Sequence, residues 1–229
     1  MSNALAEREP VSCDAARVFD TMQGGGMAIL PLDVAYAVIG TTAEAIRKIF
    51  ATKQRSFEKP SGMFATWELS RELHVMAVEH HAIARVIVEE YKLPFSIVAP
   101  YREGHALLRG TDPFVLQTST KAGTLDMLIN AGPWHDAVAR LAIERGTAVF
   151  GSSANRSLTG SKYRLEDIEP EVRQAAAITI DGGRSKYANP EGRSSTIIDF
   201  RDFRLVRRGV CCNALEAIFH ERFGITLQD

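Results

Sequence analysis

Cysteine is scarce in this sequence, and its arrangement excludes the usual structural roles of that residue. The three cysteines are Cys13, Cys211 and Cys212. Because the number is odd and two are adjacent, a disulfide framework is not expected, and a reducing compartment fits better. The adjacent pair also lacks the gap that zinc-ligand pairs need. We therefore expect neither disulfides nor a zinc site.

Long apolar runs and an excess of one charge are also missing. No stretch contains enough consecutive apolar residues to span a bilayer, and residues 1–10 are polar and acidic, unlike a signal peptide. The formal net charge is -1, so no overall basic field draws the chain to nucleic acid, although a local basic patch is still compatible. We expect a cytoplasmic protein with no membrane partner.

Several catalytic and metal-binding motifs are absent. The six histidines form no pair with helical metal spacing and no His-Glu-x-x-His run, so no metal ligands are predicted. No Gly-x-Ser-x-Gly elbow or Walker-type loop occurs. The glycine runs at Gly24 and Gly182 lack the strand–glycine–helix context of a dinucleotide site. The sequence thus argues against sites of these kinds.

What the chain does contain is an ordinary globular balance: 229 residues, of which 45% are hydrophobic and 24% charged. That length allows one large domain or two small ones, and a core without metal or disulfide support. No repeat, low-complexity tract or Pro-, Gly- or Ser-rich linker divides it. We predict a single domain over 1–229, with a core at about 12–210 and a C-terminal helix at 213–224.

Short apolar runs bounded by Gly and Pro predict strands, and a 3.6-residue period predicts helices. The predicted strands are 27–30, 36–39, 63–65, 95–99, 125–129, 147–150, 177–180, 195–200 and 203–206, with further fragments near 106–108 and 114–117. The predicted helices are 13–22, 43–51, 71–81 (capped by Ser70), 82–90, 134–145, a zone at 164–177, and 214–223. Helices alternate with strands and some strands are adjacent, so we predict an α/β fold with a mixed sheet flanked by helices.

Residues 25–60 organise the rest. The helix at 43–51 places Ile46, Ile49 and Phe50 on one face and leads into Lys53, Arg55 and Lys59. Three cations match the several negative charges of a nucleotide triphosphate, and an arginine binds two oxygens at once. The alternative, a solvated charged turn, is the commoner role of such a loop and stays open.

Three further polar clusters follow predicted strands or begin them. Ser152, Ser153 and Asn155 follow the strand at 147–150, Ser195 opens the next-to-last strand, and Arg207 follows the last. Small hydroxyl and amide groups at a strand end can reach a ligand without filling its space. Ordinary turns, a favourable strand entry and a solvated arginine pair are the structural alternatives.

Taken together, these segments resemble the YrdC-like family, which includes the threonylcarbamoyl-AMP synthases of tRNA modification. The resemblance covers about residues 25–209, and its motifs stand in one order. The family's Pro-Thr-Asp-Thr-Val-Tyr-Gly, Lys-x-Arg with Lys-Pro, Ser-Ala-Asn-x-Ser, Asp-Gly-Gly, Ser-Thr-Val-Val-Asp and Arg-x-Gly correspond to PLDVAYA (31–37), KQR (53–55) with KP (59–60), SANRS (153–157), DGG (181–183), STIID (195–199) and RRG (207–209).

The resemblance implies a twisted sheet with a large, positively lined cavity, and a reaction in which threonine and bicarbonate give a carbamate that attacks the α-phosphate of ATP and releases pyrophosphate. ATP is the expected substrate, and Mg2+ is expected to share the phosphate charge, with phosphate and water supplying most of its ligands. The catalytic residues implied are Lys53 and Arg55. The implied nucleotide-binding residues are Lys53, Arg55, Lys59, Ser153, Asn155 and Arg207, and the implied acceptor-binding residues are Val34, Tyr36, Leu128, Ser153 and Ser195.

Departures from the family pattern fall on the threonine side. Leu32 and Val34 replace both motif threonines, and Ala37 replaces the glycine after Tyr36. The family's Thr-Val-Gly-Val-Arg-Val-Pro strand aligns with residues 124–130, so its threonine-facing arginine becomes Leu128, which loses a charge-assisted hydrogen bond. Arg109 and Arg140 are candidates to replace that arginine in space.

Three hypotheses follow from the matches and the departures. The first is a threonylcarbamoyl-AMP synthase, and the second is a related nucleotidyltransferase with another amine or amino acid as acceptor. The third is a nucleotide- or double-stranded-RNA-binding module without synthase activity, with tRNA also a possible partner. Its basic face would be formed by Arg201, Arg204, Arg207 and Arg208.

Overall fold

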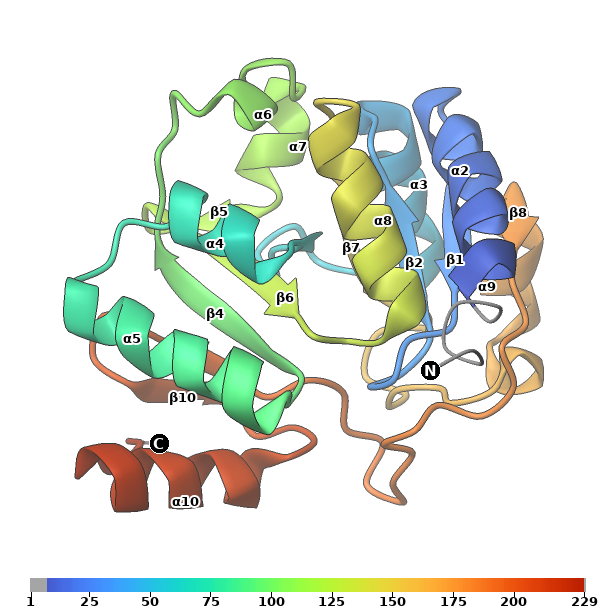
Figure 1. Ribbon diagram of the computed structural model, residues 1–229. Helices are drawn as coiled ribbons and strands as arrows, with labels where there is room; N and C mark the ends of the chain where they lie inside the picture. The colour runs from blue at the N-terminus through green and yellow to red at the C-terminus, as the bar shows by residue number, and fades with distance from the viewer. Residues whose placement is uncertain (1–7, 229) are drawn as a thin grey trace.

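A mixed ten-stranded sheet runs through the computed structural model, which describes residues 8–228 (Figure 1). Its spatial order is β10-β9-β4-β6-β3-β7-β2-β1-β8, with β5 paired to β6. Three pairs, β1 with β8, β3 with β6 and β4 with β9, are parallel and the others antiparallel, which confirms the predicted mixed sheet. The strands are β1 (Ala28–Leu30), β2 (Ala37–Gly40), β3 (Gly62–Phe64), β4 (Phe95–Pro100), β5 (Thr120–Lys121), β6 (Thr124–Ile129), β7 (Phe150–Ser153), β8 (Ile178–Thr179), β9 (Ile197–Asp199) and β10 (Arg204–Arg207).

Helices flank this sheet on both faces. They are α2 (Arg8–Gln23), α3 (Ala43–Lys53), α4 (Trp67–Leu73), α5 (Val78–Val86), α6 (Ala106–Arg109), α7 (Pro113–Gln117), α8 (Pro133–Glu144), α9 (Pro170–Ala175) and α10 (Cys212–Phe223), with a π turn η1 (Ile87–Tyr91) and a 3-10 turn η2 (Leu165–Asp167). The predicted C-terminal helix is confirmed and begins one residue earlier, at Cys212, and Gly224 caps it. Within the described residues no helix is long and apolar enough to cross a membrane.

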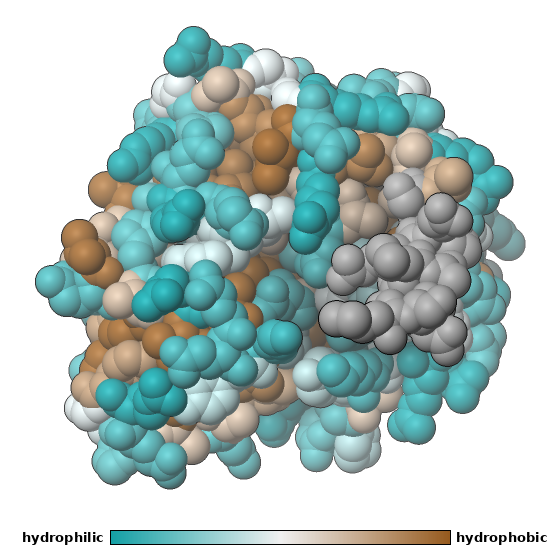
Figure 2. Space-filling model, viewed as in Figure 1, coloured by the Kyte–Doolittle hydropathy of each residue, from teal (hydrophilic) through white to brown (hydrophobic). Residues whose placement is uncertain are grey.

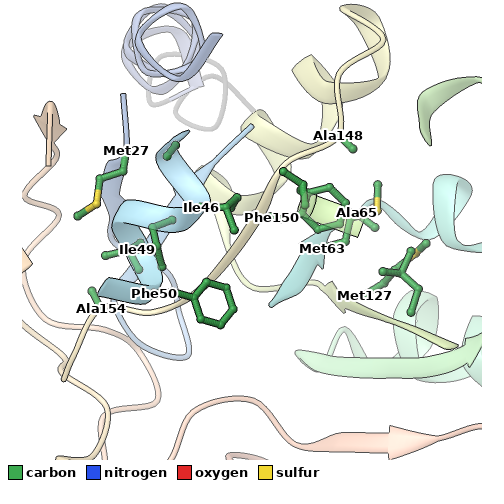
Figure 3. Packing of buried hydrophobic residues seen from close by; sticks show 14 of the residues in the cluster. Met27, Ile46, Ile49, Phe50, Met63, Ala65, Met127, Ala148, Phe150 and Ala154 are labelled. Carbon is green, nitrogen blue, oxygen red and sulfur yellow. The ribbon is translucent and has the colours of Figure 1, made fainter. Parts of the chain in front are cut away.

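Helix α3 forms for the reasons that its sequence suggests. The Thr42 hydroxyl accepts a hydrogen bond from the amide of Ala45 at 3.2 Å and caps the helix, and Glu44 lies in the first turn. Its predicted apolar face is buried against β2 and β7, where Ile46, Ile49 and Phe50 join one cluster with Phe150 (Figure 3).

Two other clusters complete the core. Helices α2 and α8 lie side by side on the other face of β1 and β2, through Phe19 of α2 and Val138 of α8 (Figure 1). Helices α5 and α10 pack on β4 and β9, where Phe219 of α10 contacts Phe200. Hydrophilic residues cover most of the face in Figure 2, with smaller hydrophobic areas between them.

Several element predictions were wrong. The helix predicted at 71–81 is two helices, because Thr66, not Ser70, caps α4, and the chain is extended at His74. His74 is fully buried: its Nδ1 accepts from the Ser70 hydroxyl at 2.9 Å, while its Nε2 donates to the Leu125 carbonyl at 3.1 Å. These two hydrogen bonds hold His74 in an extended conformation, so the helix does not continue through it.

The two strand fragments predicted near 106–108 and 114–117 are the short helices α6 and α7. Asp112 caps α7 through a 2.8 Å bond from the Phe114 amide, and Pro113 occupies the first helical position. The strand predicted at 147–150 is shifted, and β7 begins at Phe150 and continues to Ser153. Short apolar runs do not distinguish a strand from a buried helical turn.

The register of β4, β6 and β9 positions the site. Ser96 lies opposite Leu128, and Val98 lies opposite Asp126. Because successive residues of a strand face opposite sides of the sheet, the side chains of Asp126 and Leu128 share one face. Leu125, Met127 and Ile129 occupy the opposite face, in the packed core.

Candidate functional site

The cationic loop begins at the C-terminus of α3. Gln54 takes a left-handed conformation with φ 51°, which ends the helix, and the Arg55 amide donates to the Phe50 carbonyl at 2.9 Å. The Arg55 guanidinium then donates to the carbonyls of Lys59 (3.1 Å) and Pro60 (2.8 Å). Arg55, which the sequence predicts to bind phosphate, therefore also holds the conformation of this loop.

Lys53 is almost fully buried, with 1% of its surface exposed. Its ammonium group donates to the backbone carbonyls of Ser153 and Asn155, and lies 3.4 Å from the Asn155 Oδ1. Burial, with the nearby Arg55 charge, lowers the pKa of Lys53 to about 7, and Glu169 acts in the opposite direction. Lys53 thus joins α3 to the loop after β7.

The serine–asparagine motif forms that loop. The Ser153 hydroxyl donates to Asn155 Oδ1 at 2.5 Å, and the Asn155 amide group donates to the Arg156 carbonyl. Ser153 lies opposite Ala37 in the pairing of β7 with β2, so the loop starts beside the 31–37 motif. The motif is therefore more than an isolated turn.

The motif that begins at Ser195 and the motif that begins at Arg207 are joined by hydrogen bonds. Arg207 donates twice to the Ser195 carbonyl, from Nε at 3.0 Å and from Nη2 at 2.8 Å, and its Nη2 also lies 2.9 Å from the Ser195 hydroxyl. The Arg207 side chain faces the cleft, so part of its surface is exposed. Protein atoms nevertheless surround the guanidinium group closely, and this desolvation lowers the pKa of Arg207.

Tyr36 connects its motif to residues 181–183. Its hydroxyl donates to the Gly183 carbonyl at 2.9 Å, lies 3.1 Å from the Asp181 carboxylate, and accepts from the Gly182 amide at 3.1 Å. Burial raises the pKa of Tyr36 to about 12. The phenol is thus bound to the protein, and the side chain is fully buried in the core beside the inner end of the cleft.

These segments enclose a cleft with two connected chambers. The outer chamber has a volume of about 590 Å³, and the inner chamber about 100 Å³. Both are lined by Arg55, Pro60, Asp126, Ser153, Ser194, Ile197 and Arg207, so these residues form the passage between them.

The outer chamber gathers all six residues assigned to nucleotide binding: Lys53, Arg55, Lys59, Ser153, Asn155 and Arg207. Lys121, Arg193 and Arg208 add to its positive lining, and the acidic residues are Glu58 and Asp126. Such a lining suits a polyanion.

The inner chamber gathers all five residues assigned to acceptor binding: Val34, Tyr36, Leu128, Ser153 and Ser195. Neither Arg109 nor Arg140 lines either chamber, so the suggestion that one of them replaces the family's arginine was wrong. The helix that carries Arg140 packs on α2, and Arg109 donates to the Gly104 carbonyl at 2.9 Å.

Sequence reasoning assigned no role to Asp126, a charged residue within the otherwise apolar strand β6. Its Oδ1 is buried without a hydrogen-bond partner. Burial raises the pKa of the Asp126 carboxyl, while Arg207, Ser96 and Arg55 act in the opposite direction. A carboxylate within an apolar run, between Leu125 and Met127, was the signal that could have identified it.

Within the described residues no group of three or more His, Cys, Asp or Glu side chains is arranged to hold a metal ion. The chamber lining is cationic, so it fits a metal ion that arrives with phosphates better than a resident one.

Comparisons with known proteins place this geometry in a wider group. Residues 20–209 match the model of the Sua5/YciO/YrdC family, which is described as "Telomere recombination". None of the curated protein sequences compared with the chain matches it significantly.

Three solved structures illustrate the likeness in fold. A hypothetical protein, smu.1377c, from Streptococcus mutans UA159 has 18% identity and a TM-score of 0.77, with 93% of each chain covered. P. abyssi Sua5 complexed with L-threonine has 18% identity and a TM-score of 0.66, over 87% of this chain and 54% of that one. E. coli YciO has 16% identity and a TM-score of 0.63, over 87% and 90%. At these identities the likeness supports the fold.

Proposed function

The chain belongs to the Sua5/YciO/YrdC family, and from that premise we propose that it binds ATP and acts, in the cytoplasm, as a nucleotidyltransferase of the threonylcarbamoyl-AMP synthase type. The observation that carries the proposal is the outer chamber. Among the described residues, seven of its lining side chains are basic and two are acidic, and five of the basic ones, Lys53, Arg55, Lys59, Arg207 and Arg208, belong to segments that match family motifs. A triphosphate needs such a positive, partly enclosed surface.

The reaction requires positioning and charge neutralisation more than covalent help from the protein. An amine and bicarbonate give a carbamate and water, and a carbamate oxygen then forms a bond to the α-phosphorus of ATP. The bond from that phosphorus to the bridging oxygen breaks, and pyrophosphate leaves with the electron pair. The product is a carbamoyl-type adenylate, which we connect with tRNA modification.

The residues divide this work between them. Arg55, Lys59 and Arg207 would neutralise the phosphates. Lys53 would fix the loop of Ser153 and Asn155 that borders them, and would add its own charge when protonated. Mg2+ would enter with ATP, bound by phosphate oxygens and water, and would neutralise further charge.

The acceptor is threonine or another amine, bound in the inner chamber. L-threonine is bound by the P. abyssi Sua5 chain, of which this chain covers 54%. Leu32, Val34 and Leu128 make the chamber of this chain apolar, which motivates testing acceptors other than threonine.

Pyrophosphate release from MgATP and bicarbonate tests the proposal, with L-threonine, other amino acids and simple amines each added in turn. We expect release that depends on both bicarbonate and one acceptor and that is lost in Arg207→Gln. Nucleotide binding without release under any acceptor would contradict the transferase and leave a nucleotide-binding protein.

The alternative of an RNA-binding module rests on the basic β9–β10 hairpin. The guanidinium of Arg201 lies 2.7 Å from the Asp199 carboxylate, that of Arg204 3.7 Å from it, and Arg208 lies 2.9 Å from Glu216. Because neighbouring acids offset these charges, the hairpin does not favour binding of phosphate backbones. Binding of double-stranded RNA with steep salt dependence, unaffected by ATP, would support this alternative over the enzyme.

A further inference from the structure

The inner chamber shares Asp126, Arg55 and Arg207 with the outer chamber at the passage between them, and among the described residues its interior carries no charged side chain. Asp126 lies in the passage between the chambers, and its Oδ1 is buried without a hydrogen-bond partner. A buried acceptor atom without a donor is costly to fold, so its persistence points to a ligand that donates to this carboxylate.

Among the described residues that line the inner chamber alone, none is charged. Its walls are apolar where Val34, Phe64 and Leu128 contribute, and each of these is buried. The Ser195 hydroxyl is already within 2.9 Å of Arg207 Nη2, and it lies 3.5 Å from the Ser96 hydroxyl. The interior therefore suits the hydrocarbon part of a small molecule.

The two arginines at the passage are already engaged. Arg55 donates to two backbone carbonyls, and Arg207 donates to Ser195 through both Nε and Nη2. Both also line the outer chamber, where the phosphates are proposed to bind. With a nucleotide in place, Asp126 is the charged group left to meet a ligand in the inner chamber.

We propose that the inner chamber binds a small amine that has no carboxylate, and that Asp126 selects it by accepting a hydrogen bond from the amine nitrogen. This inference rests on the proposed function, because the amine is the acceptor of that reaction. The amine nitrogen of a primary amine keeps one N–H after it becomes a carbamate, so the bond to Asp126 is available in both forms. Leu128 packs on the hydrocarbon part.

A ligand that carries a carboxylate, such as an amino acid, would lack favourable contacts for that group in the inner chamber. The carboxylate would be desolvated close to the acceptor oxygens of Asp126, and beside Leu128 it would find no donor. Amino acids should therefore bind more weakly than the amines that correspond to them.

The test compares two ligands that differ in one group, L-threoninol and L-threonine. Their dissociation constants are measured by calorimetry without bicarbonate, with and without MgATP, for the wild type, Asp126→Asn and a control, Asp167→Asn. Asp167 is exposed and lies outside both chambers. We expect the wild type and the control to bind L-threoninol about tenfold or more tightly than L-threonine, and Asp126→Asn to lose most of that preference.

A second variant does not depend on how Asp126→Asn folds. Leu128→Gln places an amide donor in the chamber at nearly constant volume, and we expect it to increase the affinity for L-threonine severalfold relative to L-threoninol. The same shift in preference from both variants supports the inference.

Several results would overturn it. These are equal or tighter binding of L-threonine by the wild type, binding of neither ligand while MgATP binds, or an unchanged preference in Asp126→Asn. A loss of MgATP affinity in Asp126→Asn with the preference intact would make Asp126 a metal ligand instead. If the wild type prefers L-threoninol but does not bind MgATP, the inference stands and the proposed nucleotidyl transfer fails.

Discussion

Lys53 is the residue whose environment departs most from that of a typical lysine. Its side chain is buried against two carbonyls of the loop after β7, and burial lowers its pKa to about 7. An ammonium group in this position is partly deprotonated near neutral pH. Its charge is therefore sensitive to any anion that enters the outer chamber.

We predict that binding of MgATP at pH 8 is accompanied by proton uptake. At that pH Lys53, with a pKa of about 7, is largely neutral, and triphosphate charges raise the pKa by favouring the ammonium form. Calorimetric titrations in two buffers with different ionisation enthalpies measure the uptake. Lys59→Met, which removes an exposed lysine of the same chamber, should keep it, and proton release or no exchange in the wild type would contradict the assignment.

A second residue-scale prediction concerns His74. Burial lowers its pKa to about 4, so the unfolded chain binds a proton at higher pH than the folded one. The stability contributed by neutral His74 is present above about pH 6.5 and is lost as the pH falls towards 4, by about 3 kcal/mol in total. Urea unfolding of His74→Gln should show a flatter pH dependence across this window than the wild type. The exposed His220→Gln serves as the control, and parallel profiles for all three proteins would refute the prediction.

At the scale of elements, the site depends on close contacts between motif segments. Gly209 follows β10, and its amide donates to the Thr196 hydroxyl at 3.1 Å. A Cβ at this position would lie 2.3 Å from the Ser194 carbonyl oxygen. The backbone of residues 194–195 would have to move, and with it the partner of Arg207.

We therefore predict that Gly209→Ala destabilises the fold by about 2 kcal/mol or more and weakens MgATP binding. Gly104→Ala is a matched control, because no atom lies within 4 Å of a Cβ built there. Chemical denaturation and ATP titration of both variants provide the comparison. Equal behaviour of the two would show that the contact at Gly209 is not needed.

Sequence patterns predicted elements best where period and caps agreed. The apolar face of α3 and the strands β4 and β6 follow the pattern closely. The split at His74 could not be predicted, because it depends on a bond to Leu125, 51 residues away. The short helices α6 and α7 were missed because a few apolar residues carry no clear period.

The part of the candidate site that lies within the family motifs could be predicted from the sequence. The motifs identified part of the lining of both chambers, but not the mutual bonds of those residues, such as that of Arg207 with Ser195. Asp126 was missed because its importance comes from the strands beside it. Only the register of β4 and β6 shows that it faces the cleft.

At the scale of the whole molecule, the cleft is formed by strands from most of the sheet. Lining residues come from β2, β3, β4, β5, β6, β7, β9 and β10, from the end of α3 and from loops. A ligand in the cleft therefore contacts segments far apart in the chain. Motif segments that are spread over residues 31–209 thus contribute to the lining of one cleft.

Nucleotide binding in the outer chamber can be measured as the affinity for MgATP by calorimetry. We predict saturable binding by the wild type, at least about tenfold weaker binding by Arg207→Gln, and unchanged binding by Arg164→Gln, whose arginine lies outside both chambers. No binding by the wild type, or equal binding by all three proteins, would contradict it.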